Sequence, residues 1–330
     1  MNPADQDAEA PGPDAVRALQ AELQEWLIRT PVVRCRGLED RLGMSATVFG
    51  KLEFLQRTGT FKPRGALSTM LRLDTSVLAN GVTAVSAGNH AIATAFAARA
   101  LGVTAKVVMI PSANPLRVSA CRDLGAEIVV ADDVHHAFEL ADEICASEGR
   151  YFVHPFEGPA VAAGTATIGM EILEQVDEFD AVVVPIGGGG LCAGIASAIK
   201  QAQPDCEVVG VEPTGADSMR RSFSSGAPER LAQVSTIADS LGAPFAMPYS
   251  FSLCRRYVDD IVLVEDEAIR QAMAWLFVDM KIAVEPACAA TTAALAGALR
   301  TRFDGKRVVL VFCGSNIDRE SFHRFAGPYL

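Results

Sequence analysis

The chain has 330 residues, half of them hydrophobic, so it can bury a large core, and its length favours about two domains. Its formal net charge is −11. Binding to nucleic acid or to an anionic membrane surface needs clustered Lys and Arg, so this charge argues against both and favours small molecules as partners.

Short runs rich in β-branched residues alternate with longer Ala- and Leu-rich stretches along the chain. This alternation is typical of βα units around a mostly parallel sheet, so the predicted fold class is α/β. The predicted strands, in chain order, are 47–51, 83–86, 106–110, 127–130, 182–185, 208–212, 261–264 and 308–312. One helix is predicted over 90–101, ending before Gly102, and another after Gly190 through Lys200.

The beginning of the chain is polar and acidic, without the basic start and apolar segment of a secretory signal. We predict a disordered tail over residues 1–15. The longest uncharged run, 181–199, contains Pro185 and four successive glycines, which would break a membrane helix, so we expect no membrane span. Eight scattered cysteines show no C-x-x-C pair, which is typical of reduced thiols in a cytoplasmic protein.

A run of four glycines follows the predicted strand 182–185 and precedes a predicted helix. The run consists of Gly187, Gly188, Gly189 and Gly190. Residues without a Cβ allow successive backbone N–H groups to converge on an anion beside a helix N-terminus. The loop is therefore predicted to bind phosphate.

The same loop leaves a second interpretation open. Gly188, Gly190 and Ala193 fit the dinucleotide pattern G-x-G-x-x-A, and Glu212 ends the next predicted strand, where a ribose-binding acid belongs. An NAD-linked oxidoreductase is thus an alternative. Against it, a dinucleotide loop normally opens its domain, whereas at least three predicted βα units precede this one.

Lys62 stands between an aromatic ring and a proline, in Phe61-Lys62-Pro63. A partly apolar pocket disfavours the charged form of an amine, which lowers its pKa and frees it to form imines. A single lysine is more often a surface charge, so this interpretation depends on the other motifs.

Two polar turns accompany the lysine and the glycine loop. Ser86-Ala87-Gly88-Asn89-His90 precedes a predicted helix and could hold a carboxylate through backbone N–H groups, although an ordinary helix cap is the alternative. Cys313-Gly314-Ser315-Asn316 follows the strand 308–312, where sites of α/β proteins commonly lie.

These four motifs, in this order and spacing, resemble those of a known family. From about Thr30 onward the chain is similar to the fold-type II pyridoxal-phosphate enzymes, specifically the serine/threonine dehydratase and serine racemase group. The resemblance implies a tryptophan synthase β-like fold with two domains, each a mostly parallel twisted sheet flanked by helices. A large cofactor domain would comprise 16–78 and 159–330, and a small domain 79–158. It also implies a homodimer.

The resemblance assigns a role to each motif. Lys62 becomes the Schiff-base lysine and catalytic base, with Phe61 on the pyridine ring and Asn89 at the 3-oxygen of pyridoxal phosphate. Cys313 would face the ring nitrogen, where a serine is common. The phosphate would be held by Gly187, Gly188, Gly189, Gly190 and the Leu191 amide. The substrate carboxylate would be held by Ser86, Ala87, Gly88, Asn89 and His90.

The implied reaction is dehydration and deamination of a small β-hydroxy-amino acid, such as L-threonine or L-serine, to a 2-oxo acid and ammonia. Racemases of the group have a serine at the position of Ala87 that serves as a second acid/base. An alanine methyl cannot carry a proton, so dehydration is favoured over racemization. A non-catalytic amino-acid-binding relative is a further alternative.

Two features of the substrate and metal sites stay open. The substrate side chain could also be the carboxylate of 3-hydroxyaspartate or the aryl group of phenylserine, although we expect Arg117, Arg255 and Arg256 to face solvent. The loop from Glu212 to Ser218 resembles the family's cation site through Glu212 and the Ala216 carbonyl, but Ser218 replaces the usual acid. One carboxylate fewer weakens a divalent site, so a divalent or monovalent cation is not part of the main prediction.

Overall fold

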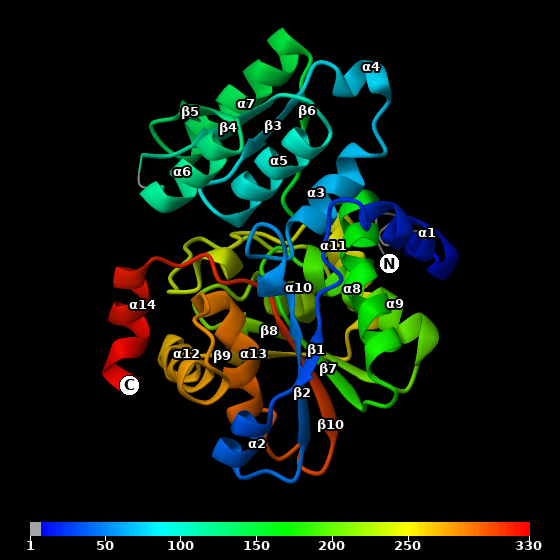
Figure 1. The fold of residues 1–330 in the computed structure, drawn as a ribbon, viewed down its shortest axis with the longest axis vertical. Helices are drawn as coiled ribbons and strands as arrows, with labels where there is room; N and C mark the ends of the chain where they lie inside the picture. The colour runs from blue at the N-terminus through cyan, green and yellow to red at the C-terminus, as the bar shows by residue number, and fades with distance from the viewer. Residues whose placement is uncertain (1–7, 112) are drawn as a thin grey trace.

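The computed structural model describes residues 8–111 and 113–330, and its strands form two sheets. The six-stranded sheet has the order β1-β2-β10-β7-β8-β9 and the four-stranded sheet the order β5-β4-β3-β6. Figure 1 shows the smaller sheet above the larger one. The predicted α/β class is confirmed by this architecture.

The larger sheet is parallel except at one edge, where β1 pairs antiparallel with β2. Its strands are β1 (Val32–Arg34), β2 (Thr47–Leu52), β7 (Ala181–Pro185), β8 (Glu207–Pro213), β9 (Asp260–Val264) and β10 (Arg307–Phe312). Every residue of β7 is buried, as expected for a Val-rich strand covered on both faces. Helix α13 (Pro286–Ala296) contacts β7 to β10, and α9 (Gly190–Ala202) lies on the opposite side of the sheet (Figure 1).

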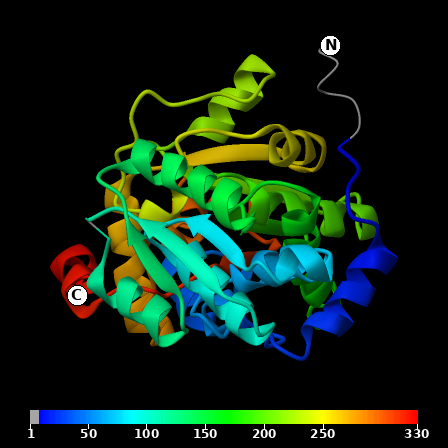
Figure 2. The same cartoon turned by 90° about the horizontal axis from the view of Figure 1, so that it is seen from above.

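The smaller sheet is entirely parallel and has its own hydrophobic cores on both faces. Its strands are β3 (Val82–Val85), β4 (Ala105–Met109), β5 (Glu127–Val130) and β6 (Tyr151–Phe152). Neighbouring residues of β4 point to opposite faces: Val107 packs with α5 (Asn89–Ala100), and Val108 with α7 (Val134–Glu148). Figure 2 shows these helices on the two sides of the sheet.

The remaining helices surround the two sheets. They are α1 (Pro13–Leu23), α2 (Arg36–Leu42), α3 (Pro63–Met70), α4 (Thr75–Leu78), α6 (Pro115–Asp123), α8 (Pro159–Gln175), α10 (Ser218–Ser225), α11 (Pro248–Tyr257), α12 (Asp266–Met280) and α14 (Arg319–Ala326). Helix α3 contacts both α8 and α5, so it lies where the two sheets meet. Among the described residues, none belongs to a helix long and apolar enough to cross a bilayer.

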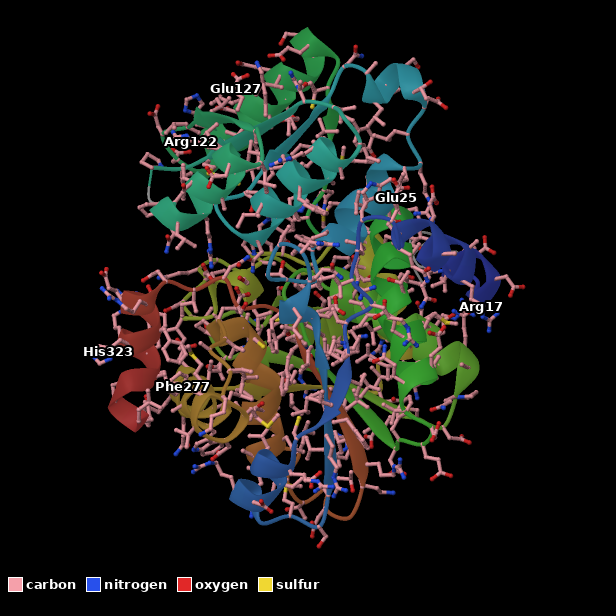
Figure 3. The ribbon with its side chains drawn as sticks, viewed as in Figure 1. Arg17, Glu25, Arg122, Glu127, Phe277 and His323 are labelled. Atoms are coloured by element: carbon pink, nitrogen blue, oxygen red, sulfur yellow. The ribbon has the colours of Figure 1, made fainter. Side chains whose placement is uncertain are left out.

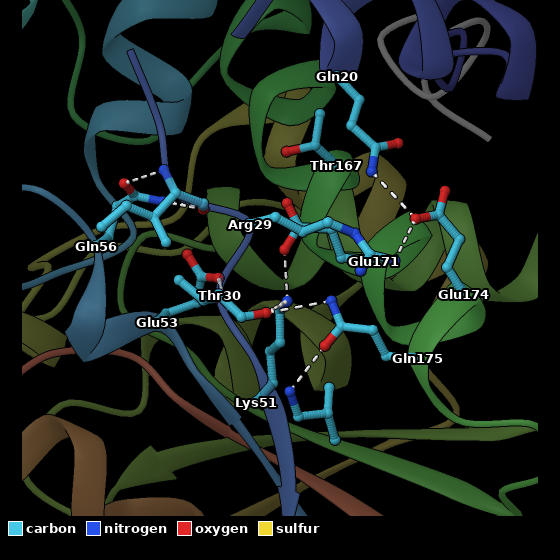
Figure 4. Close-up of polar contacts among 12 residues, drawn as sticks. Gln20, Arg29, Thr30, Lys51, Glu53, Gln56, Thr167, Glu171, Glu174 and Gln175 are labelled. Carbon is cyan, nitrogen blue, oxygen red and sulfur yellow. Dashed lines mark hydrogen bonds and ion pairs between the residues drawn. The ribbon is translucent and has the colours of Figure 1, made fainter. Parts of the chain in front are cut away.

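Buried charged side chains hold the N-terminal end of helix α3 in place. The guanidinium of Arg64 donates to Glu53 (2.8 Å) and to Glu171 of α8 (2.7 Å), and Lys51 of β2 also bonds Glu171. Figure 4 shows Lys51, Glu53 and Glu171 close to one another. Two cations and two carboxylates balance there, which makes their burial tolerable and fixes the start of α3.

The eight predicted strands all appear, each within one residue of its predicted ends. The strands β1 and β6 were not predicted, because both are too short to show a pattern. The predicted tail was wrong from Pro13 onward, where α1 begins with a proline at its first position; residues 1–7 lie outside the described part of the chain. The domain limits at 78/79 and 158/159 stay a prediction.

Candidate active site

Lys62 lies immediately before helix α3, where the two sheets meet, and its amine points to the chain segment between β6 and α8. Its Nζ donates to the carbonyl of Pro155 at 2.7 Å. Burial lowers the pKa of Lys62 to about 8 from its ordinary value of 10.5, although the nearby Cys313 and Glu285 act in the opposite direction. A substantial fraction of this amine is therefore neutral near pH 8 and able to act as a nucleophile or base.

The glycine loop lies against Phe156, and this contact explains why the loop has no side chains. A Cβ on Gly188 would lie 2.3 Å from the Phe156 ring, and one on Gly190 would lie 2.2 Å from the Phe156 carbonyl oxygen. Gly189 has a left-handed φ of 95° and immediately precedes α9. The first N–H groups of α9 lack acceptors within the helix, an arrangement that suits the binding of an anion.

The turn after β3 faces the same region as Lys62. Helix α5 begins at Asn89, and the Ser86 hydroxyl accepts from the Gly88 N–H at 3.1 Å. The side chain of His90 turns away to the Val153 carbonyl, with Nε2 at 2.7 Å from the oxygen. Burial lowers the pKa of His90 to about 3, so its ring is neutral and donates this bond.

Cys313 directly follows β10 and lines the same pocket as Lys62 and the glycine loop. Its carbonyl accepts from the Phe61 N–H at 3.1 Å, which ties this turn to the lysine segment. A hydrogen bond with Cys288, together with burial, raises the pKa of the Cys313 thiol well above its ordinary value. The thiol is therefore neutral.

The structure brings the two predicted groups of residues together. One pocket is lined by every predicted cofactor residue: Phe61, Lys62, Asn89, Gly187, Gly188, Gly189, Gly190, Leu191 and Cys313. An adjoining cavity of about 340 Å³ is lined by Lys62 and by every residue of the predicted carboxylate turn, Ser86, Ala87, Gly88, Asn89 and His90. The individual roles of these residues remain predictions.

Two residues of the site were missed from the sequence. Glu285 lines the cofactor pocket and is 1% exposed, and Phe156 lines both cavities. Glu285 left a signal, because it is the single charged residue between Ile282 and Leu299 in an otherwise apolar and small-residue stretch. Phe156 left none, since its place depends on contacts between distant segments.

Arg117 was expected to face solvent, and this prediction was wrong. Its side chain is buried beside the carboxylate turn, where Nη1 donates to Asp239 (2.6 Å) and Nη2 to the Asn316 carbonyl (3.1 Å). The reason is that α6 turns this position toward the larger sheet instead of outward. Arg255 and Arg256 are exposed, as predicted, and each lies over an aromatic ring.

The Glu212 carboxylate is hydrogen-bonded within the fold. Its two oxygens accept from the Met219 N–H (2.9 Å) and the Arg220 N–H (2.7 Å) at the start of α10, and the side chain is fully buried. It is therefore not available to a ribose, which weakens the NAD interpretation.

The loop through Ala216 and Ser218 does not fit a divalent cation, since its one buried carboxylate, that of Glu212, is already hydrogen-bonded. Among the described residues, no cluster of His, Cys, Asp and Glu could hold a metal.

The cofactor pocket fits pyridoxal phosphate by its chemistry. Lys62 would supply an amine for the aldehyde, and the glycine loop would supply N–H groups for the phosphate, in a cradle that a Cβ would fill. Asn89 would supply an amide for the phenolic oxygen, and Cys313 a neutral thiol for the ring nitrogen.

Known proteins resemble this chain over most of its length. The family model described as pyridoxal-phosphate dependent enzyme matches residues 23–314. Phenylserine dehydratase of Ralstonia pickettii is 50% identical over 317 residues, covering 96% of this chain and 97% of that protein. L-threonine ammonia-lyase of Geobacter sulfurreducens is 40% identical over 297 residues, covering 90% of this chain and 73% of that protein.

The fold comparison agrees with the sequence comparison. The structure of maize serine racemase superposes with a TM-score of 0.90 at 32% identity, and covers 96% of this chain and 97% of that one. The matched family model, the relatives and the residues that line the pocket all indicate a pyridoxal-phosphate enzyme. The chain belongs to the pyridoxal-phosphate dependent enzymes of fold type II.

Proposed function

We propose that the protein is a pyridoxal-phosphate-dependent ammonia-lyase that converts a β-hydroxy-α-amino acid to a 2-oxo acid and ammonia. The observation that carries this proposal is that Lys62 lines two adjoining cavities, one with the glycine loop and one with the turn from Ser86 to His90. A proton leaves Cα and a hydroxide leaves Cβ, which together make one water molecule. A second water molecule then hydrolyses the product and releases its nitrogen as ammonia, so the atoms balance. The named activities of the similar dehydratase and ammonia-lyase support it.

The protein's own residues orient the substrate and remove its Cα proton. When bound, the cofactor supplies an electron sink for negative charge at the substrate Cα. The Lys62 Nζ removes the Cα proton, and its lowered pKa of about 8 leaves a fraction of it free to do so near neutral pH. Backbone N–H groups at the start of α5 orient the substrate carboxylate.

Two residues favour elimination over other reactions of the cofactor. The neutral thiol of Cys313 does not force the ring nitrogen to remain protonated, which weakens the electron sink and favours prompt loss of the β-leaving group. Ala87 lines the substrate cavity with a methyl group that carries no proton, so re-protonation on its side is slow. Racemization is therefore a minor reaction in this proposal.

The substrate cavity favours an apolar side chain beyond the β-hydroxyl. Its lining includes apolar groups from β3 and from loops, namely Val85, Ala87, Pro155, Phe156 and Ala243. Arg117 is ion-paired with Asp239 and is not free to bind an acidic side chain. We therefore propose phenylserine as the preferred substrate, ahead of threonine and serine, with 3-hydroxyaspartate the poorest of the four.

The test is a substrate panel on purified protein that has been loaded with pyridoxal phosphate. We expect a visible absorbance band that survives gel filtration, and 2-oxo acid formation in the order given above. Lys62→Ala should lose both the retained band and turnover, whereas the exposed Lys306→Ala should keep both. A loaded protein that forms no 2-oxo acid from any of the four amino acids would refute the proposal.

The assembly and compartment are part of the same proposal. We infer a homodimer, as the resemblance implies, and a cytoplasmic location, which the eight unpaired cysteines support. Light scattering coupled to size-exclusion chromatography tests the first, and a mass near that of a single chain would contradict it. Cell fractionation tests the second.

A further inference from the structure

Glu285 is a buried carboxylate that borders the cofactor pocket. It immediately precedes α13, and its backbone N–H donates to the Gly314 carbonyl at 3.3 Å, beside the turn after β10. Its two oxygens accept from the Asn89 Nδ2 at 2.8 and 3.0 Å, and one of them also accepts from the Asn316 N–H at 3.2 Å. Arg117, whose charge acts on Glu285, forms its ion pair with Asp239 instead. A buried carboxylate without its own cation is costly to the fold.

The hydrogen bonds around Glu285 determine which end of the Asn89 amide is nitrogen. The carbonyl of Thr58 can only accept, so the atom of Asn316 that lies 2.8 Å from it must be Nδ2. The same Nδ2 lies 2.9 Å from Asn89, whose facing atom must then be the acceptor Oδ1. The other end of Asn89 is therefore Nδ2, which donates to Glu285.

Glu285 keeps Asn89 in this orientation from the opposite side. A carboxylate accepts hydrogen bonds and donates none, so a reversed Asn89 would set two acceptors against each other. The Asn89 Nδ2 also donates to the Ser240 hydroxyl at 3.2 Å. The nitrogen end of the Asn89 amide thus faces Glu285 and Ser240, which both line the cofactor pocket, whereas its oxygen faces Asn316.

We propose that Glu285 is a positioning residue that holds the Asn89 amide with its N–H, not its carbonyl, toward the 3-oxygen of the cofactor. This inference rests on the proposed function, because it takes pyridoxal phosphate as the occupant of the pocket. Glu285 itself acts through Asn89.

The test compares two ligands that differ by the 3-oxygen alone. Apoprotein is titrated with pyridoxal 5′-phosphate and with 3-deoxypyridoxal 5′-phosphate, and the Kd of each is read from the visible absorbance and from tryptophan fluorescence. Glu285→Gln replaces one acceptor oxygen by a donor at nearly constant shape. We expect it to weaken pyridoxal phosphate binding about tenfold, the size of one lost hydrogen bond, and to leave the 3-deoxy analogue unchanged.

Two further variants make the comparison specific. The double variant Asn89→Ala with Glu285→Gln should bind pyridoxal phosphate no more weakly than Asn89→Ala alone, since Glu285 acts through Asn89. Glu265→Gln is the matched control, because Glu265 precedes α12 as Glu285 precedes α13, yet is exposed. It should bind both ligands like the unchanged protein.

Asn316→Asp examines the same chain of hydrogen bonds from its other end, and covers the case in which Glu285→Gln does not fold. It replaces the donor to Asn89 Oδ1 by an acceptor, which favours the reversed amide, so the same selective loss is expected. Equal losses for both ligands, or additive losses in the double variant, would show that Glu285 is merely structural and overturn the inference. An unchanged protein that binds neither ligand would instead refute the proposed function.

Discussion

The guanidinium of Arg117 and the carboxylate of Asp239 form an ion pair that joins the two sheets beside the substrate cavity. Arg117 belongs to α6, next to the smaller sheet, and Asp239 to a short 3-10 turn next to the larger one; Nη1 and Oδ2 are 2.6 Å apart. The Arg117 side chain is 11% exposed and that of Asp239 57%. The two residues also line a further cavity of about 450 Å³. The pair is thus part of the lining of two cavities and links the two sheets.

Removing this ion pair at the lining of the substrate cavity should weaken substrate binding more than chemistry. For Arg117→Gln we expect the KM for phenylserine to rise about tenfold, which corresponds to about 1.4 kcal/mol, with kcat falling less than threefold. Steady-state kinetics check this, with the urea midpoint as a measure of stability. Arg122→Gln on the same helix is the control, because Figure 3 shows Arg122 on the outside of the smaller sheet. Equal effects of the two variants would contradict the prediction.

The glycine loop should not tolerate a methyl group. In Gly190→Ala the new Cβ would lie 2.2 Å from the Phe156 carbonyl oxygen, a backbone atom that cannot turn aside. We expect the affinity for pyridoxal phosphate to fall at least about tenfold and stability by about 1–3 kcal/mol, the usual cost of overpacking. Gly12→Ala is the control, since a Cβ there meets nothing within 4 Å. Cofactor titration and urea unfolding measure both quantities, and unchanged cofactor affinity in Gly190→Ala would count against the anion-site interpretation.

The buried charges beneath α3 should be sensitive to the loss of one member. Arg64→Met leaves Glu53 and Glu171 with Lys51 as their remaining cation, and we expect a loss of about 3–5 kcal/mol in the free energy of unfolding. Arg29→Met removes a pair with Glu174 whose side chains are 47% and 40% exposed, also drawn in Figure 4, and should cost at most about 1 kcal/mol. Urea unfolding separates the two. Similar costs would show that burial does not matter here.

The raised pKa of Glu212 predicts that the stability of the protein falls as the pH rises. Burial raises its pKa to about 8 from an ordinary 4.5. Between these values the folded protein holds a proton that the unfolded chain has released, so the free energy of unfolding falls as pH rises through this window. Glu212→Gln removes this contribution, at most about 1.4 kcal/mol per pH unit. Urea unfolding from pH 5 to 8 should therefore give a steeper decline for the unchanged protein. Parallel curves would contradict the assignment.

The sequence predicted the strands, and which residues would gather around one pocket, because both depend on short local motifs. Buried parallel strands are short runs of β-branched residues, and Lys62, the glycine loop and the Ser86 turn each lie in one short motif. Arg117, Phe156 and Glu285 could not be placed in the same way. Their positions result from contacts between segments far apart in the chain, such as Arg117 with Asp239, which local patterns do not specify.

The position of β10 has a consequence for how the protein folds. This strand lies between β2 and β7, although all other strands of both sheets precede it in the chain. The larger sheet therefore stays divided until β10 is inserted, and the turn after β10 supplies Cys313 to the pocket and Asn316 to the hydrogen bond with Asn89. During synthesis, residues leave the ribosome from the N-terminus onward. Cofactor can accordingly be captured in its final place only after β10 has emerged, which makes loading a late event in the maturation of the enzyme.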